Sequence, residues 1–176
     1  MIRSWGMQTL TGNAQPLFGD KITAAFNKIK QQPNGFYFVA VAKASQYQLG
    51  DRIILGIGSG SPTNCLMVGG INTSTNILSC MSEGDAPVVA WPVNTQLCLD
   101  IACAQLIVQS GPDNAGTIWL GSDNTVTNIG GGSAFGYAPA GGSYNFGQAQ
   151  WNCLRTSEAW MAGTLNDLAG VPAIII

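Results

Sequence analysis

Glu83 and Asp85 are the closest pair of carboxyl groups in this chain that could carry out acid–base chemistry. Two carboxyl groups on either side of a glycosidic bond can hydrolyse it, one as the acid and the other as the base or nucleophile. Asp100, the one acid in an apolar stretch, is a third candidate. Because Glu83 and Asp85 flank Gly84 in an expected surface turn, we interpret them as solvated charges. A hydrolase that uses these residues is kept as an alternative.

The chain has no histidine, which excludes Ser-His-Asp and Cys-His catalysis. Its five cysteines lack the paired spacing of zinc sites, and Cys65, Cys80 and Cys98 lie in apolar runs, where a reduced thiol acts as a small hydrophobic group. Asp113-Asn114 and Asp123-Asn124 lack the pattern of a calcium loop and are expected to form Asx turns. We therefore expect no enzyme, no metal and no cofactor.

Charge is scarce in this sequence. Only 9% of its 176 residues are charged, against about 25% in ordinary soluble domains, and the net charge is −2. The seven cations form no basic stripe, so nucleic acid is not an expected partner. No apolar run is long enough to cross a membrane, and the N-terminus lacks the pattern of a secretory signal. The polar surface is then either covered by protein partners or simply neutral and rich in hydroxyl groups.

These candidate residues must be positioned by β-structure, because most apolar runs have the length and composition of strands. One helix is expected at 21–31, where Asp20 could cap the first turn and Ile22, Ala25, Phe26 and Ile29 recur at helical spacing. The segment 44–81 is expected to form three strands joined by tight turns, in a small meander or barrel. The expected strands are 36–42, 52–55, 65–68, 77–80, 95–101, 104–108, 117–121, 125–129, 150–154, 159–162 and 171–176.

The fold class that follows is mainly β: an antiparallel β-sandwich or small barrel modules with one short N-terminal helix. We expect an N-terminal arm and helix at 1–35, a barrel-like module at 36–103 and a sandwich-like module at 104–176. A single compact domain is the alternative. The C-terminal strand must be paired or buried, because an exposed apolar edge would aggregate.

Several turn-and-strand patterns in the sequence resemble a known class of protein. These patterns look like the small β-modules of tailed-bacteriophage virion proteins. In the first module they are Tyr47 with Gly50-Asp51-Arg52, and in the second they are Leu120-Gly121-Ser122, the turn Pro139–Ser143 and the strand Trp160–Ala162. The resemblance covers roughly residues 36–176. It offers no catalytic residue to carry over, because these modules have none.

The resemblance implies a non-enzymatic virion structural protein that is made in the cytoplasm of the host bacterium. The capsid-coating members of this class bind the major capsid protein or other virion proteins and commonly form trimers, so we expect a capsid decoration or cement protein that bridges capsid subunits. A neck or tail component is the alternative.

The expected interface residues lie in three places. The N-terminal arm carries Trp and Met side chains, which are unfavourable to expose to water unless the arm docks on a partner. The C-terminal strand could add to the sheet of a neighbouring molecule. The Gly-rich passage 130–147 carries aromatic side chains that could either dock on a partner or fill the core. The candidates are Ile2, Arg3, Trp5, Met7, Tyr137, Tyr144, Phe146, Ile174, Ile175 and Ile176. A glycan-binding receptor module that uses Tyr137, Tyr144 and Trp151 is a further alternative.

Overall fold

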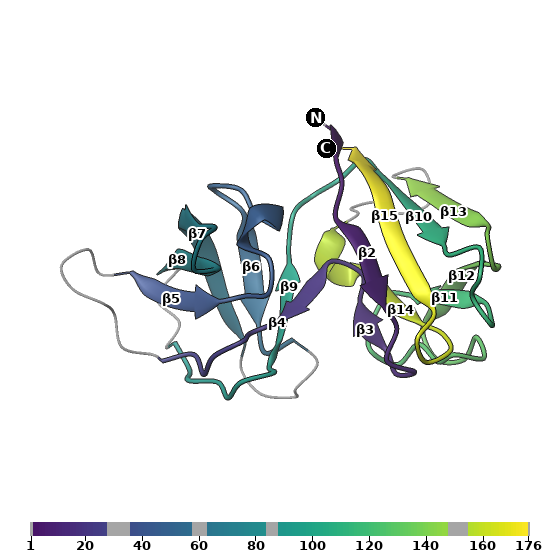
Figure 1. Cartoon of the computed structure of the whole chain (residues 1–176), viewed down its shortest axis with the longest axis horizontal. Helices are drawn as coiled ribbons and strands as arrows, with labels where there is room; N and C mark the ends of the chain where they lie inside the picture. Colours follow the sequence, from purple (N-terminus) through teal and green to yellow (C-terminus); the bar gives the residue numbers. More distant parts are fainter. Residues whose placement is uncertain (1, 28–35, 58–62, 84–87, 148–154, 176) are drawn as a thin grey trace. The chain divides into compact units, whose positions relative to one another are not determined.

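The computed structural model describes residues 2–27, 36–57, 63–83, 88–147 and 155–175, and the regular secondary structure in these ranges is almost entirely β-strand (Figure 1). Every strand pairing within these ranges is antiparallel. Helical residues there are confined to two short 3-10 turns, η1 (Ala44–Gln46) and η2 (Thr156–Glu158). The prediction of a mainly antiparallel β protein is therefore confirmed.

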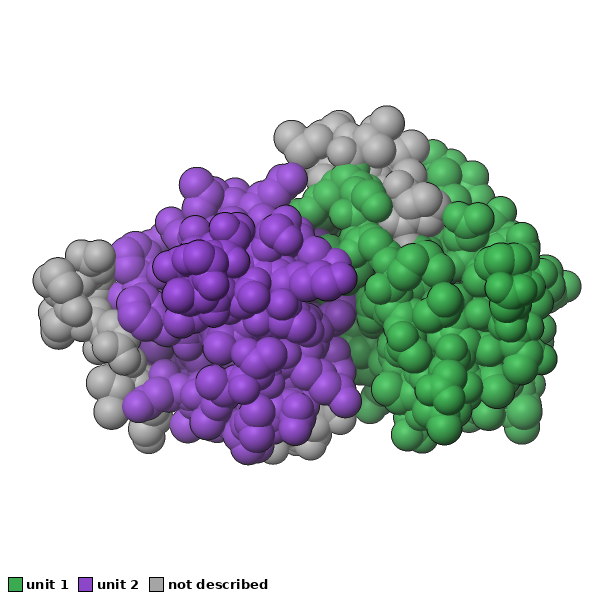
Figure 2. All heavy atoms as spheres, in the orientation of Figure 1, with its two compact units in different colours: residues 1–18, 101–176 green, residues 19–100 purple. Residues whose placement is uncertain are grey.

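The chain divides into two compact units, which Figure 2 shows in different colours. Unit 1 combines residues 1–18 with residues 101–176, and unit 2 consists of residues 19–100. Along the sequence, unit 2 is therefore an insertion between the two segments that form unit 1. The domain boundaries that we expected from the spacing of strands and turns in the sequence, at 1–35, 36–103 and 104–176, stay a prediction.

Unit 2 is built on one six-stranded sheet that curves into a half-barrel. Its two end strands approach each other, because the Thr23 N–H donates to the Ala40 carbonyl at 2.9 Å and the Ala42 N–H donates to the Asp20 carboxylate at 3.0 Å. The strands are hydrogen-bonded in the order β4 (Gly19–Lys21), β9 (Gln96–Leu99), β6 (Arg52–Leu55), β7 (Asn64–Asn72), β8 (Ile77–Ser82) and β5 (Tyr37–Ala40).

Strand alternation fills the inside of the half-barrel. Successive side chains of a strand point to opposite faces, so alternate residues of β5, β6, β8 and the first half of β7 enter the core. The rings of Phe26 and Tyr37 meet there with centroids 6.0 Å apart. The fully buried strand residues of unit 2 are Val39, Ile53, Leu55, Leu66, Val68, Leu78, Cys80, Leu97, Cys98 and Leu99.

The predicted three-strand meander is confirmed in β6, β7 and β8, which are neighbours in both sequence and sheet. Asn72 shapes the turn between β7 and β8, because its side-chain oxygen accepts the N–H groups of Ser74 and Thr75, each at 3.1 Å. Asn76 closes this turn with a positive φ of 54°, which asparagine tolerates. The predicted strand at 36–42 is β5.

The helix expected at 21–31 is not formed in its described part, residues 21–27, and its remainder lies outside the described residues. Lys21 ends β4, and Phe26 forms a β-bridge with Trp91. The N–H groups of Ile22 and Phe26 bond to Thr95 and Trp91 rather than to a carbonyl four residues earlier. Ile22 and Phe26 are both buried, so tertiary packing against distant strands overrides the helical spacing.

Unit 1 contains two antiparallel sheets. In the five-stranded sheet, β15 (Leu168–Ile175) is the central strand. On one side it pairs with both β1 (Ile2–Arg3) and β2 (Gly6–Thr9), and on the other with β10 (Gln105–Ser110). β10 in turn pairs with β13 (Ser143–Gly147). The four-stranded sheet has the order β12 (Ala134–Ala138), β11 (Ile118–Gly121), β14 (Trp160–Ala162), β3 (Gln15–Pro16). The N-terminal arm is thus part of both sheets.

The strand expected at 125–129 is instead part of a turn-rich loop that joins β11 to β12. The Asp123 carboxylate accepts the N–H of Thr125 at 2.8 Å, which is the Asx turn that its sequence predicted. Val126 is buried, but the loop around it bonds to itself rather than to a neighbouring strand. The strand expected at 150–154 lies outside the described residues.

Four cysteines fall in the described ranges, and all are free thiols. Cys80, Cys98 and Cys103 are buried, and Cys65 on β7 is half-buried. Burial raises the pKa of the Cys80 thiol to about 12 and also raises the pKa of Cys98. These two thiols are therefore protonated at neutral pH.

The first prediction concerns Trp5, which is buried and packs edge-on against Phe18 with ring centroids 6.2 Å apart. Because Trp5→Ala leaves a large cavity in unit 1, we expect it to lower the free energy of unfolding by about 3 kcal/mol. Met7→Ala, at an exposed position of the same arm, should change it by less than about 1 kcal/mol. Urea unfolding of both variants, followed by fluorescence, measures the difference. Equal losses would contradict the buried position of Trp5.

The second prediction concerns the reactivity of the thiols. At pH 8, iodoacetamide should modify Cys65 of the native protein well before Cys80 or Cys98, because thiolate is the reactive form and both buried thiols stay protonated. Mass spectrometry of the alkylated peptides follows each site. Labelling of Cys80 as fast as Cys65, before the protein unfolds, would contradict this account.

Candidate interaction surfaces

The N-terminal candidates lie inside unit 1 rather than on a free arm. Arg3 and Trp5 are buried, and the guanidinium carbon of Arg3 lies 5.9 Å from the centre of the Trp5 ring. Met7 is exposed, and it is the exposed one among Arg3, Trp5 and Met7, the members of this group whose side chains are described. Ile2 pairs with Ile175 through the backbone. The exposure that made Trp5 a docking candidate is thus not found, and contact of any of these residues with a partner stays a prediction.

The C-terminal candidates belong to a strand that is paired on both sides. Ile174 lies opposite Arg3 of β1 and Leu106 of β10, and Ile175 lies opposite Ile2 and Gln105. The expectation that this apolar strand is paired is confirmed. Because β1 occupies the edge that a neighbour would need, strand addition at Ile174 and Ile175 would first require β1 to leave. Ile176 lies outside the described residues.

The aromatic candidates of the Gly-rich passage have different environments. Tyr144 is half-buried on β13, opposite the buried Val108, and its ring lies 6.4 Å from the ring of Phe135. Tyr137 on β12 is 53% exposed. Phe146 pairs with Leu106 through the backbone, and its side chain lies outside the description, as does Trp151. Tyr144 is thus less accessible than Tyr137, and the choice between docking and core filling for these aromatic residues stays a prediction.

Trp119 is the residue that the sequence reasoning missed. It lies directly opposite Tyr137 in the β11–β12 pairing, and the two ring centroids are 5.3 Å apart at an angle of 49°. The signal for this pair was present in the sequence, since Thr117–Gly121 was recognised as a strand. What was lacking was the register, because the long loop between the strands hides which residues are opposed.

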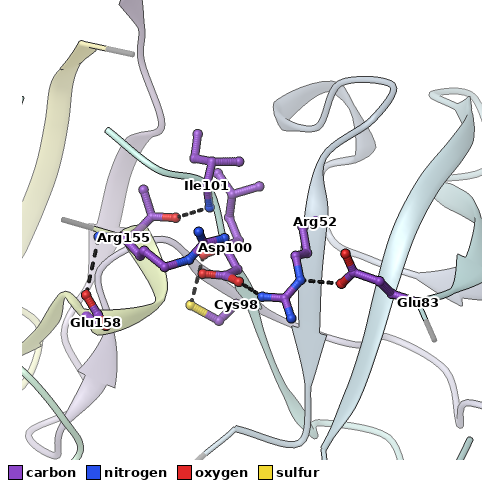
Figure 3. Close-up of polar contacts among 9 residues, drawn as sticks. Arg52, Glu83, Cys98, Asp100, Ile101, Arg155 and Glu158 are labelled. Atoms are coloured by element: carbon purple, nitrogen blue, oxygen red, sulfur yellow. Dashed lines mark hydrogen bonds and ion pairs between the residues drawn. The ribbon is translucent and has the colours of Figure 1, made fainter. Parts of the chain in front are cut away.

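The carboxylate candidates form a charge cluster around Arg52 (Figure 3). Arg52 lies on β6, and its guanidinium donates from Nε to Glu83, which follows β8, and from Nη1 to Asp100, which follows β9. The Asp100 side chain is only 1% exposed, whereas those of Glu83 and Arg52 are about one-third exposed. Asp85 lies outside the described residues. The arrangement neutralises a buried carboxylate and ties three strands together, which is a structural role.

No metal-binding group emerges from the described parts of the chain, since no three acidic or thiol side chains there are placed to hold an ion. Within the same ranges, no helix is long and apolar enough to cross a membrane.

The outer face of the half-barrel carries a row of apolar side chains. Met67 of β7 and Met81 of β8 are directly opposed, and Phe38 of β5 lies opposite Ser79, two residues from Met81 along β8. These three side chains are 37%, 44% and 45% exposed. Phe36 and Met81 both reach over Gly69, where a side-chain Cβ would meet them at 3.0 and 3.5 Å. We call Phe36, Phe38, Met67 and Met81 the outer apolar row.

No protein-family model and no curated protein match the chain. Two solved structures have a faint likeness to it: VP17, a capsid protein of bacteriophage P23-77, and the VP16-VP17 complex of the two major capsid proteins of that phage. Both alignments have 12% identity and cover 99% of this chain, with a TM-score of 0.22 over 69% of VP17 and 0.21 over 71% of the chain in the complex. TM-scores this low do not establish a common fold, and the likeness carries no argument about function.

The third prediction separates the two ends of the Arg52 cluster. Arg52→Ala removes the guanidinium from the buried Asp100 carboxylate, so we expect the free energy of unfolding to fall by about 3 kcal/mol. Glu83→Ala removes only the exposed partner and should change it by less than about 1 kcal/mol. Chemical denaturation of the two variants measures this. A larger loss for Glu83→Ala would contradict the structural role of the Arg52 and Asp100 pair.

Proposed function

We propose that the chain is a non-enzymatic structural protein of a bacteriophage virion, most specifically a decoration or cement protein that binds the major capsid protein and bridges capsid subunits. The observation that carries this proposal is the outer apolar row of the half-barrel. Monomeric soluble proteins rarely expose contiguous apolar patches larger than a few hundred Å², and such larger patches mark interaction surfaces.

The surroundings of the row support this role. The ionised side chains described next to it, Arg52 and Glu83, are bonded to each other, and with the buried Asp100 they form a cluster of one positive and two negative groups. Covering the row with a partner removes apolar surface from water at a gain of roughly 25 cal/mol per Å². Each contact of this kind is weak, but an oligomer that engages several capsid subunits at once binds with avidity, because its further contacts are intramolecular. A small, charge-poor β protein suits this task.

The resemblance of the turn-and-strand patterns to tailed-phage virion modules points the same way and supplies the finer assignment. On this proposal the protein resides in the virion, and a homotrimer on a local symmetry axis is the favoured assembly. A component of the neck or tail would use the same apolar surface, and the number of copies in each particle separates the two placements. Mass spectrometry of purified virions should find the protein in hundreds of copies for the head and in a handful for the neck. Its absence from virions would overturn the proposal.

The fourth prediction tests the row itself. Met81→Lys places a charge in the centre of the outer apolar row, so the number of copies in each virion should fall at least about tenfold, because a buried unpaired charge is strongly unfavourable. Leu165→Lys is the matched control, since it adds the same charge at an exposed leucine of unit 1. Virions from phages that carry each variant are compared by quantitative mass spectrometry. Equal incorporation of both variants would rule out the row as the attachment surface.

A further inference from the structure

The β11–β12 hairpin holds an exposed aromatic side chain next to a tightly bonded polar loop. Tyr137 is about half exposed, and Trp119 beside it is half-buried. Aromatic rings present both an apolar face and, in tyrosine, a polar hydroxyl group, which suits ligands that are apolar on one face and polar at the edge. The two rings are tilted by 49° rather than parallel, so Trp119 supports Tyr137 from the side.

Trp119 is itself fixed by the loop. Gly130 has a φ of +80°, and a Cβ at this position would lie 2.7 Å from the Trp119 ring, so the backbone approaches the indole in a way that only glycine permits. Gly132 also has a positive φ, and a Cβ there would collide with the Thr125 carbonyl. These two glycines hold the loop against the hairpin.

The loop is held in shape by its own polar groups. The Asp123 carboxylate accepts bonds from the hydroxyl and N–H of Thr125 at 2.6 and 2.8 Å, and the Thr125 hydroxyl accepts the Ser133 N–H at 3.0 Å. The Thr127 hydroxyl accepts the Gly131 N–H at 2.8 Å. Hydrogen bonds from Thr125 and Ser133 lower the pKa of Asp123, so its exposed carboxylate is ionised at neutral pH. An acceptor-rich loop of fixed shape is thus joined to an aromatic platform.

We propose that this hairpin is a glycan-binding site, in which the ring of Tyr137 stacks on the apolar face of a pyranose and the exposed polar groups of loop 122–133 bond its hydroxyl groups. Trp119 acts as a positioning residue that sets the tilt of Tyr137. A sugar fits better than a nucleic acid, because the anionic Asp123 would repel phosphate groups. It also fits better than a wholly apolar protein segment, because loop 122–133 exposes the polar side chains of Asp123, Asn124 and Thr125 as well as the apolar side chain of Ile129.

This inference does not depend on a place in the virion, and its failure would leave the proposed attachment surface intact. A virion protein with such a site could also contact the polysaccharides of a bacterial surface. The site lies in unit 1, whereas the outer apolar row lies in unit 2, so substitutions can separate the two functions.

The test uses the full chain on a printed array of bacterial cell-surface oligosaccharides. The native protein should bind a subset of them, and Tyr137→Ala should weaken this binding at least about tenfold, whereas Tyr137→Phe, which keeps the ring, should bind within about threefold of the native protein. Met7→Ala is the control at an exposed apolar residue outside the hairpin. Thermal unfolding verifies that each variant is folded.

Two further results bear on the mechanism. Binding should persist at roughly 0.5 M NaCl, because stacking is not screened by salt. Gly130→Ala should weaken oligosaccharide binding, since the added methyl group displaces the Trp119 indole. The same displacement should change the tryptophan emission spectrum of the folded chain. The proposal is overturned if the native protein binds no oligosaccharide on the array, if Tyr137→Ala binds as well as the native protein, or if all binding is lost at high salt.

Discussion

The alternation of side chains across each strand, in a chain with few charged residues, is the constraint on which the rest of the structure depends. Along β7, Leu66 and Val68 enter the core of unit 2, while Met67 between them must face outward. In ordinary soluble domains about 25% of residues are charged, and the solvent-facing positions of a sheet are mostly polar. Here only 9% of all residues are charged, and the outward positions of neighbouring strands carry methionine and phenylalanine instead. The same pattern that builds the half-barrel therefore creates an apolar surface outside it.

The few charges that do enter the sheets are used for structure. Arg52 is placed between a buried and an exposed carboxylate and joins the ends of β6, β8 and β9. In unit 1, β15 has a comparable role, since it pairs with β1, β2 and β10 and so joins the two ends of the chain in one sheet. Both devices stabilise the units internally. The surfaces that we propose to meet other molecules are the outer apolar row and the Trp119 and Tyr137 pair.

Local patterns predicted the strands well, because branched and aromatic runs such as Phe36–Ala42 and Gln105–Val108 have one clear interpretation. The prediction of a helix at 21–31 was wrong because Ile22 and Phe26 are four residues apart. This spacing fits one face of a helix, and it equally fits an irregular segment in which both side chains are buried in a core. Surface residues were harder to predict, since exposure is a property of pairing. Trp5 was expected on a free arm and is buried beside Phe18, while Trp119 gained its importance from a cross-strand neighbour eighteen positions away, Tyr137. Single-sequence patterns contain neither relation.

The central claim is that this protein acts through contacts of its sheet surface, with the outer apolar row as the face that binds the particle. An electron cryomicroscopy reconstruction of the virion tests it most directly. The account predicts density for the half-barrel with Phe38, Met67 and Met81 covered by a neighbouring virion protein. A reconstruction that shows the protein bound with these three side chains open to solvent would contradict it.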